Sequence, residues 1–309
     1  MKLCAPIVLA LAFWASPGLR ADVTIRYQSE FKTSAALGPA MEPFMKAMQA
    51  GSATTVLMRG NQAYTKAGNR IQIFDLVKRE MTLIDPADKT FASFPVSQFA
   101  DKMADAVPQA KPEQIEAAQQ AMASIKTNLD SKLTGNSAEI QGVQAEEREV
   151  TLTMDIPTPS GMNQPALNMK LVMHIWTPKK EEVLRVPAIR ELTAYQALQK
   201  YIVNPAGMLD KMFGKMPGMS STMGPMFDEI NKIPSVILRM HMELYMPFLA
   251  AAAKQMADGP MPGPMMEMNQ EVAELSSAPV DASLFEIPKD YAAVPADDML
   301  RDMLHPQAK

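Results

Sequence analysis

Methionine is the residue type in this chain whose number and spacing most suggest a specific chemistry. The sequence has 28 methionines in 309 residues, and fourteen of them fall between residues 208 and 268. Thioether sulfur is a soft ligand that favours Cu(I) over harder cations. Pairs of methionines three residues apart therefore define a candidate soft-metal site, formed by Met216, Met219, Met223 and Met226.

Methionine also has two roles in proteins that involve no metal. It is unbranched and polarizable, so it suits surfaces that accept varied apolar ligands, and it also fills protein cores. Met240, Met242 and Met246 lie at alternate positions of one predicted strand, so its apolar face already accounts for them. The sequence leaves all three roles open and favours a core or an apolar ligand surface over copper.

Other arrangements that could carry catalysis are weak. His174, His241 and His305 are far apart in sequence, which excludes a short-range zinc motif such as H-E-x-x-H. Residues 29–32 match S-x-x-K, but the S-D-N and K-T-G partners of that motif are missing from the chain. His174 and His241 each fall on the polar face of a predicted strand, where solvated side chains are the favoured interpretation. We therefore expect a non-enzymatic protein without a cofactor.

The first 21 residues have the features of a secretory signal peptide. Lys2 is followed by an apolar stretch over residues 3–16, and Ala21 is a small residue suited to cleavage. The apolar stretch is shorter than the roughly 20 residues that cross a bilayer. We expect cleavage after Ala21, a periplasmic or secreted location, and no transmembrane segment in the mature chain.

Cysteine content and charge narrow the function further. Cys4 is the only cysteine, so the cleaved chain has neither a disulfide nor a thiolate nucleophile. Loss of Lys2 and Arg20 lowers the formal charge by two, from −4 to −6. Such a chain has no basic surface for nucleic acid. Protein partners are not indicated by any motif.

Alternation of apolar and polar residues predicts many short antiparallel strands. Hairpin signals such as Gly60-Asn61 separate several of them, and short connections favour antiparallel neighbours. Helical spacing is expected over residues 35–50, 112–129 and 188–203. The predicted strands cover residues 23–28, 54–59, 64–66, 71–78, 81–84, 90–94, 150–156, 167–176, 236–246 and 266–275.

These elements predict an α+β fold in which a curved antiparallel sheet, an incomplete β-barrel, carries a few helices on its concave face. We expect one domain over residues 22–295, with an irregular insertion rich in Met, Pro and Gly at 204–232 and a flexible tail at 296–309. The ligand-binding face would be apolar positions of two strands, namely Leu167, Met169, Leu171, Met173, Val236, Leu238, Met240, Met242, Leu244 and Met246.

The order of elements also resembles that of a known family. A strand directly after the signal segment, a meander containing residues 71–75 and 85–91, and a closing segment at 283–291 are similar to secreted bacterial proteins of unknown function. That group resembles the lipoprotein-carrier (LolA-like) half-barrel superfamily. The resemblance implies a curved sheet around an apolar cavity and a lipid-like or other apolar ligand. The alternative functions are a Met-rich Cu(I)-binding protein and a structural envelope protein.

Overall fold

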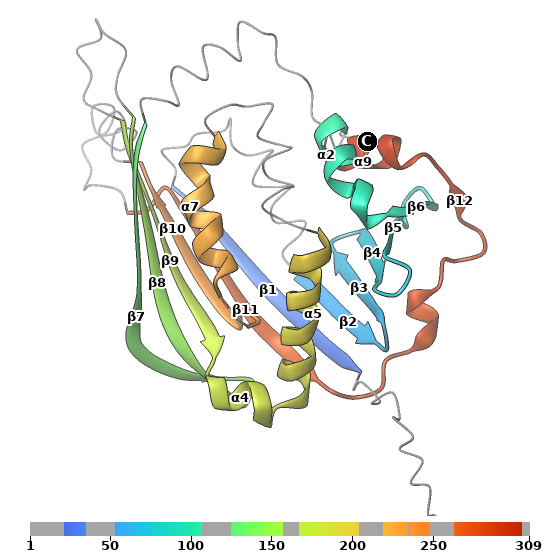
Figure 1. The fold of residues 1–309 in the computed structure, drawn as a ribbon, viewed down its shortest axis with the longest axis horizontal. Coiled ribbons are helices and arrows are strands. Elements are labelled where there is room, and N and C mark those ends of the chain that lie inside the picture. The colour runs from blue at the N-terminus through green and yellow to red at the C-terminus, as the bar shows by residue number, and fades with distance from the viewer. Residues whose placement is uncertain are drawn as a thin grey trace, which may run out of the picture.

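A single large sheet organises the chain. The computed structural model describes residues 22–34, 53–106, 125–156, 167–203, 219–233, 235–246 and 263–304. Within these ranges twelve strands form one sheet in the order β12-β6-β5-β4-β3-β2-β1-β11-β10-β9-β8-β7. Neighbouring strands are antiparallel except for β12 and β6. Figure 1 shows the sheet bending around a few helices, which confirms the predicted α+β class.

The first part of the sheet is a meander of local hairpins. Two of its tight turns place glycine in the left-handed region, with φ of 57° at Gly60 and 58° at Gly68, a conformation that glycine adopts without steric cost. The predicted strands of this part are confirmed, except that the strand expected over 71–78 ends at Asp75. They are β1 (Val23–Thr33), β2 (Ala53–Arg59), β3 (Gln62–Ala67), β4 (Arg70–Asp75), β5 (Glu80–Asp85) and β6 (Thr90–Pro95).

The second part contains longer strands, of which the first differs from expectation. β7 covers Lys126–Ile140, so Leu129 lies on a strand and not at the end of the predicted helix over 112–129. Leu129 pairs with Leu152 on β8. This strand pairing overrides the helical spacing between Met122 and Leu129 that had predicted a helix. The remaining strands are β8 (Val143–Ile156), β9 (Leu167–Pro178), β10 (Arg239–Tyr245) and β11 (Met266–Ser276).

Helices pack inside the curve of the sheet (Figure 1). The predicted helix over 188–203 is confirmed as α5 (Pro187–Val203). The prediction of irregular chain over 204–232 is wrong for its second half. Residues 219–231 form a helix, α7 (Met219–Asn231), which accommodates Pro225. Further short elements are η3 (Val96–Gln98), α2 (Phe99–Ala106), α4 (Lys180–Arg185), η4 (Ala282–Phe285), β12 (Ala292–Ala293) and α9 (Ala296–Leu304).

The main core lies between the sheet and these helices. Ile189 of α5 and Leu300 of α9 are fully buried, together with Ile25 of β1 and with Leu238, which directly precedes β10. The sequence predicted a loose or weakly helical tail from residue 296. The structure gives a helix there, and α9 packs against α2 and β6 with Leu300 and Met299 in the core. The charged residues of this segment concealed an amphipathic helix.

A second apolar layer covers the opposite face of β2–β6. Leu57, Tyr64 and Ile73 alternate with the main-core residues of their strands, so their side chains point to the other face. The C-terminal connection before α9 packs there through Val280 and Phe285. Arg59 fixes this connection by donating a hydrogen bond to the Val280 carbonyl at 2.6 Å. Figure 1 shows the connection running outside the sheet.

Some expectations lie outside the described residues. These are the signal segment 1–21, the helix over 35–50, residues 112–124 of the helix expected over 112–129, and the first part of the insertion at 204–218. In the ranges that the structure covers, no helix combines the length and hydrophobicity needed to cross a bilayer.

Candidate functional site

The structure brings most of the predicted ligand-binding residues to one face of the sheet. β9 and β10 are antiparallel neighbours, and Met240 pairs with Ile175, Met242 with Met173 and Leu244 with Leu171. The two strands therefore share an apolar face, as their alternation predicted.

That face is covered by α7. An apolar cluster joins the second half of this helix, and the turn after it, to the strands. The helix side contributes Met226, Ile230 and Ile233, and the predicted ligand face contributes Met169, Leu171, Met173, Met240 and Met242. Val236 and Leu238 are buried in the main core. Leu244 and Met246 are half-buried, and Leu167 begins β9 with a side chain of which the structure gives no description. The predicted ligand face is thus largely packed, because a helix forms where the sequence predicted irregular chain.

The four candidate copper ligands do not form a described site. Met226 is buried in the apolar cluster under α7. Met219 and Met223 lie on the backbone of α7, but their side chains, like all of Met216, fall outside the described residues. Among the residues that the structure describes, no group of three or more His, Cys, Asp or Glu side chains is arranged to hold a metal ion.

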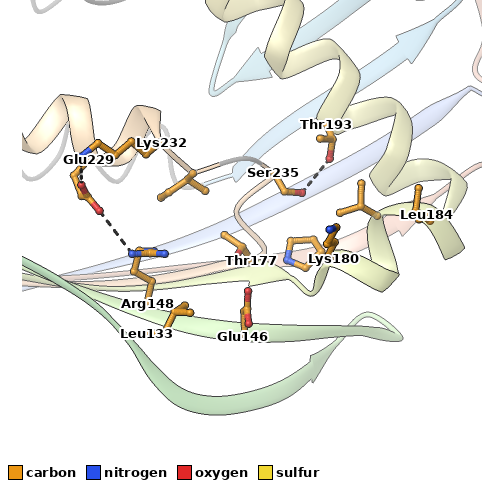
Figure 2. A pocket seen from close by; sticks show the side chains of 13 residues that line it. Leu133, Glu146, Arg148, Thr177, Lys180, Leu184, Thr193, Glu229, Lys232 and Ser235 are labelled. Carbon is orange, nitrogen blue, oxygen red and sulfur yellow. Dashed lines mark hydrogen bonds and ion pairs between the residues drawn. The ribbon is translucent and has the colours of Figure 1, made fainter.

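An open cavity of about 720 Å³ lies beside the packed face, between β7–β9 and the helices α4, α5 and α7 (Figure 2). Its volume falls in the range of roughly 300–1,000 Å³ that is typical of small-molecule sites. Its apolar lining includes Leu133, Val183, Leu184 and Ile233. Of the predicted ligand-binding residues, none of the nine whose side chains are described lines it.

Two of the cavity's leucines are unusually exposed. Leu184 is 74% exposed and Leu133 is 56% exposed. In the described part of the chain only four large apolar side chains are exposed, the other two being Val77 and Leu284. Clustering of such side chains around one hollow is typical of a binding surface.

The short helix α4 holds Leu184 in this position. Glu181 and Glu182 lie in its first turn and Arg185 in its last, which complements the helix dipole. Arg185 forms an ion pair with Glu182, which lowers the pKa of that carboxyl, and also donates a hydrogen bond to the Gly142 carbonyl at 2.9 Å. α4 is thereby fastened to the β7–β8 turn, and Leu184 projects beside the cavity.

One end of the cavity is charged. Arg148 on β8 donates a hydrogen bond to the Ser131 hydroxyl at 3.1 Å and lies 3.6 Å from a carboxylate oxygen of Glu229 on α7. Lys232 donates to the other Glu229 oxygen at 2.8 Å. Hydrogen bonds from Lys232 and Ser131 lower the pKa of Glu229, so this carboxyl is ionised at neutral pH. Figure 2 shows Arg148 reaching from the sheet toward the helix side of the cavity.

The middle of the cavity is polar and contains hydroxyl groups. Thr193 of α5 and Ser235 share a hydrogen bond of 3.0 Å. Thr177 lies on the sheet side between this pair and Glu146 (Figure 2). The cavity therefore combines an apolar wall, a hydroxyl-lined middle and a charged end, which suits binding of an amphipathic molecule.

A second polar cluster lies on the opposite face of β7–β10, where His174 and His241 pair. His174 Nδ1 lies 3.0 Å from Glu147 Oε1, and His241 Nε2 lies 3.2 Å from Glu243 Oε1. His241 Nδ1 also lies 2.6 Å from Asn269 Oδ1. Both ring nitrogens of His241 are therefore engaged, which leaves it poorly placed as a base or a metal ligand for an external molecule. Solvated histidines were expected, but side-chain hydrogen bonds bind both rings.

A second cavity, of about 860 Å³, lies between the β3–β4 hairpin, β5 and α9. Its lining includes Asp85, Asp88, Asp298 and Asp302 beside apolar residues such as Ile84. None of the four exposed large apolar side chains of the described residues lines this cavity. The cavity at α4 is therefore the better candidate for an apolar ligand.

The sequence did not identify Arg148, Leu184, Glu229 or Lys232 as site residues. They come from β8, α4, α7 and the turn after α7, so no short motif contains them. The charge order of α4, acidic at the start and basic at the end, is the one local signal that could have located the helix carrying Leu184.

Comparison with known proteins assigns no family. No protein-family model and no curated protein sequence matches the chain. Among solved structures, the chain is similar to one described as PNGF-II in a C2 space group, at 8% identity and a TM-score of 0.31. The match covers 92% of this chain and spans about a third of the other, 33%. At that score the likeness carries no argument about fold or activity.

Proposed function

We propose that this chain is an exported, non-enzymatic binding module that holds an apolar or lipid-like molecule in the cavity between β7–β9 and the helices α4, α5 and α7. The observation that carries the proposal is that Leu133 and Leu184 both line this cavity and are both more than half exposed. Covering such surface with a ligand is favourable by about 25 cal/mol per Å² of apolar area removed from water.

The arrangement of the cavity fits binding better than catalysis. Its hydroxyl pair, Thr193 and Ser235, bond to each other. The ion pairs at its charged end link Arg148 to Glu229 and Glu229 to Lys232, and so join β8 to α7 and the turn after it. The proposal of a LolA-like binding module, and of a periplasmic or secreted location, rests on the sequence resemblance and the signal-like segment together with this open, helix-lined sheet.

A hydrophobic fluorophore provides the direct test. The purified protein should enhance the emission of 1-anilinonaphthalene-8-sulfonate or Nile red at a saturable site, and Leu184→Gln should weaken this binding because it places an amide on the apolar wall. Since Leu184 is strongly exposed, its replacement should leave the unfolding temperature nearly unchanged.

Val77→Gln is the matched control. Val77 is 71% exposed but does not line the cavity. The Val77→Gln variant should bind the fluorophore like the unaltered protein. Equal binding by the Leu184 variant and the control would place the ligand elsewhere and reject this cavity.

A further inference from the structure

We propose that the cavity selects amphiphiles with an anionic headgroup, a carboxylate or a phosphate, which binds to Arg148 while the apolar tail lies along Val183, Leu184 and Ile233. This inference rests on the proposed function and names the class of molecule that the cavity takes. Figure 2 shows Arg148 and Leu184 at opposite ends of the cavity, as a ligand with a polar head and an apolar tail requires.

Arg148 has donor capacity that its contacts with the described residues leave unused. It donates a hydrogen bond to Ser131, and its distance of 3.6 Å to Glu229 is too long for a good hydrogen bond. A guanidinium carries several N–H donors in a planar fork that fits a carboxylate or phosphate in bidentate fashion. The side chain is 33% exposed and lines the cavity, so an entering anion can reach it.

The neighbouring carboxylate neutralises this end only in part. Glu229 already accepts a hydrogen bond from Lys232 at 2.8 Å, and its side chain is only 13% exposed. Among the described residues of the lining, the charged groups are Arg148, Lys180 and Lys232 against Glu146 and Glu229, an excess of one positive charge. The chain as a whole is negative, at −4, so the local excess of positive charge runs against the overall charge.

A matched series of twelve-carbon amphiphiles tests the headgroup. Dodecanoate, dodecyl phosphate, dodecanol and dodecyltrimethylammonium share a tail and differ in the head, and each is titrated below its micellar concentration against bound fluorophore. We expect at least one of the anions to bind about tenfold tighter than dodecanol, as one hydrogen-bonded ion pair would give. The cation should bind most weakly. The stronger of the two anions identifies the head as carboxylate or phosphate.

Three variants separate recognition from folding. Arg148→Gln should remove the preference for anions and leave the affinity for dodecanol unchanged. Glu229→Gln should strengthen anion binding, because it removes a competing carboxylate, and a purely structural role for the Arg148–Glu229 pair does not predict that gain. Lys132→Gln is the control, since Lys132 lies on β7 next to Leu133, pairs with Glu149 and does not line the cavity.

The outcomes are distinct. Equal affinity for anion, alcohol and cation, or an anion preference that survives Arg148→Gln, overturns the headgroup assignment while the proposed apolar-binding function stands. If no member of the series displaces the fluorophore, the proposed function itself fails.

Discussion

His174 and His241 are directly opposite each other on β9 and β10, with ring centroids 6.0 Å apart and planes tilted by 31°. Each ring is bound on one side by its own carboxylate, His174 by Glu147 and His241 by Glu243. The Tyr245 hydroxyl donates to the second oxygen of Glu243 at 3.0 Å. A continuous polar row therefore runs across the outer face of the sheet. It extends from β7, where the pairing with β8 shifts register between Leu133 and Ser137, to β10.

Glu147 is the most buried carboxylate in this row. Its ionisation should make the free energy of unfolding depend on pH in the acid range. Burial raises the pKa of Glu147, but hydrogen bonds from Thr134, Asn136 and His174 together outweigh burial and lower it below its ordinary value of 4.5. A lowered folded-state pKa gives stability that is complete above pH 4.5 and is lost as the pH falls through the folded value. Glu147→Gln should lower the free energy of unfolding by about 1–3 kcal/mol at pH 7 and flatten the loss below pH 4.5.

Urea unfolding between pH 3 and pH 7 measures this effect. Glu149→Gln serves as the control, because Glu149 lies on the same strand and pairs with the exposed side chain of Lys132. Its acid dependence should match that of the unaltered protein. Identical curves for both variants would contradict the role given to Glu147.

The methionines of β10 should be replaceable by leucine. Met240 and Met242 pack against the apolar cluster under α7, and Met-to-Leu changes in cores usually cost less than ~1.5 kcal/mol. The triple change at Met240, Met242 and Met246 should therefore keep the unfolding temperature and fluorophore binding nearly unchanged. A parallel triple change at Met216, Met219 and Met223 examines the candidate copper ligands.

A Cu(I) competition titration decides between packing and metal binding. We expect no tight stoichiometric copper uptake by the unaltered protein or by either variant. Tight uptake that disappears in a leucine variant would favour the metal function, because leucine has no sulfur donor.

The C-terminal helix should be essential for stability. Leu300 is fully buried among residues of the main core, so Leu300→Ala should lower the free energy of unfolding by about 2–5 kcal/mol. Arg301→Ala is the control, since the Arg301 side chain is 61% exposed. Urea denaturation of the two variants measures the difference. If Leu300→Ala lowered the free energy of unfolding by less than Arg301→Ala does, α9 would be dispensable for stability.

Strands were predicted well where local pattern determines them. The alternation over residues 167–176 and 236–246 predicted both strands, although β10 covers only 239–245 of the second range. Their pairing follows because a one-residue slip would expose their apolar face. β11 (Met266–Ser276) likewise matches the strand expected over 266–275. In each of these cases the side-chain period and the tertiary environment favour the same structure.

The errors arose where tertiary contacts override local signals. Gly224 and Pro225 indicate irregular chain, yet α7 forms because Met226, Ile230 and Ile233 bury their side chains against the sheet. The cavity could not be predicted for a related reason. Arg148 and Glu229 are 81 residues apart in sequence and meet only after α7 docks on β8.

The central position of β1 has a consequence for the order of folding. β1 lies between β2 and β11, and Gln270 donates a hydrogen bond to Ser29 across a sequence separation of 241 residues. The meander β2–β6 and the hairpin β7–β8 close through local contacts, which form fast, whereas the β1–β11 seam has to wait for nearly the whole chain. Until residues 266–276 are made, one edge of the first strand has no partner and is open to pairing with other chains. β11, which is made after ten other strands of the sheet, thus completes the environment of the first.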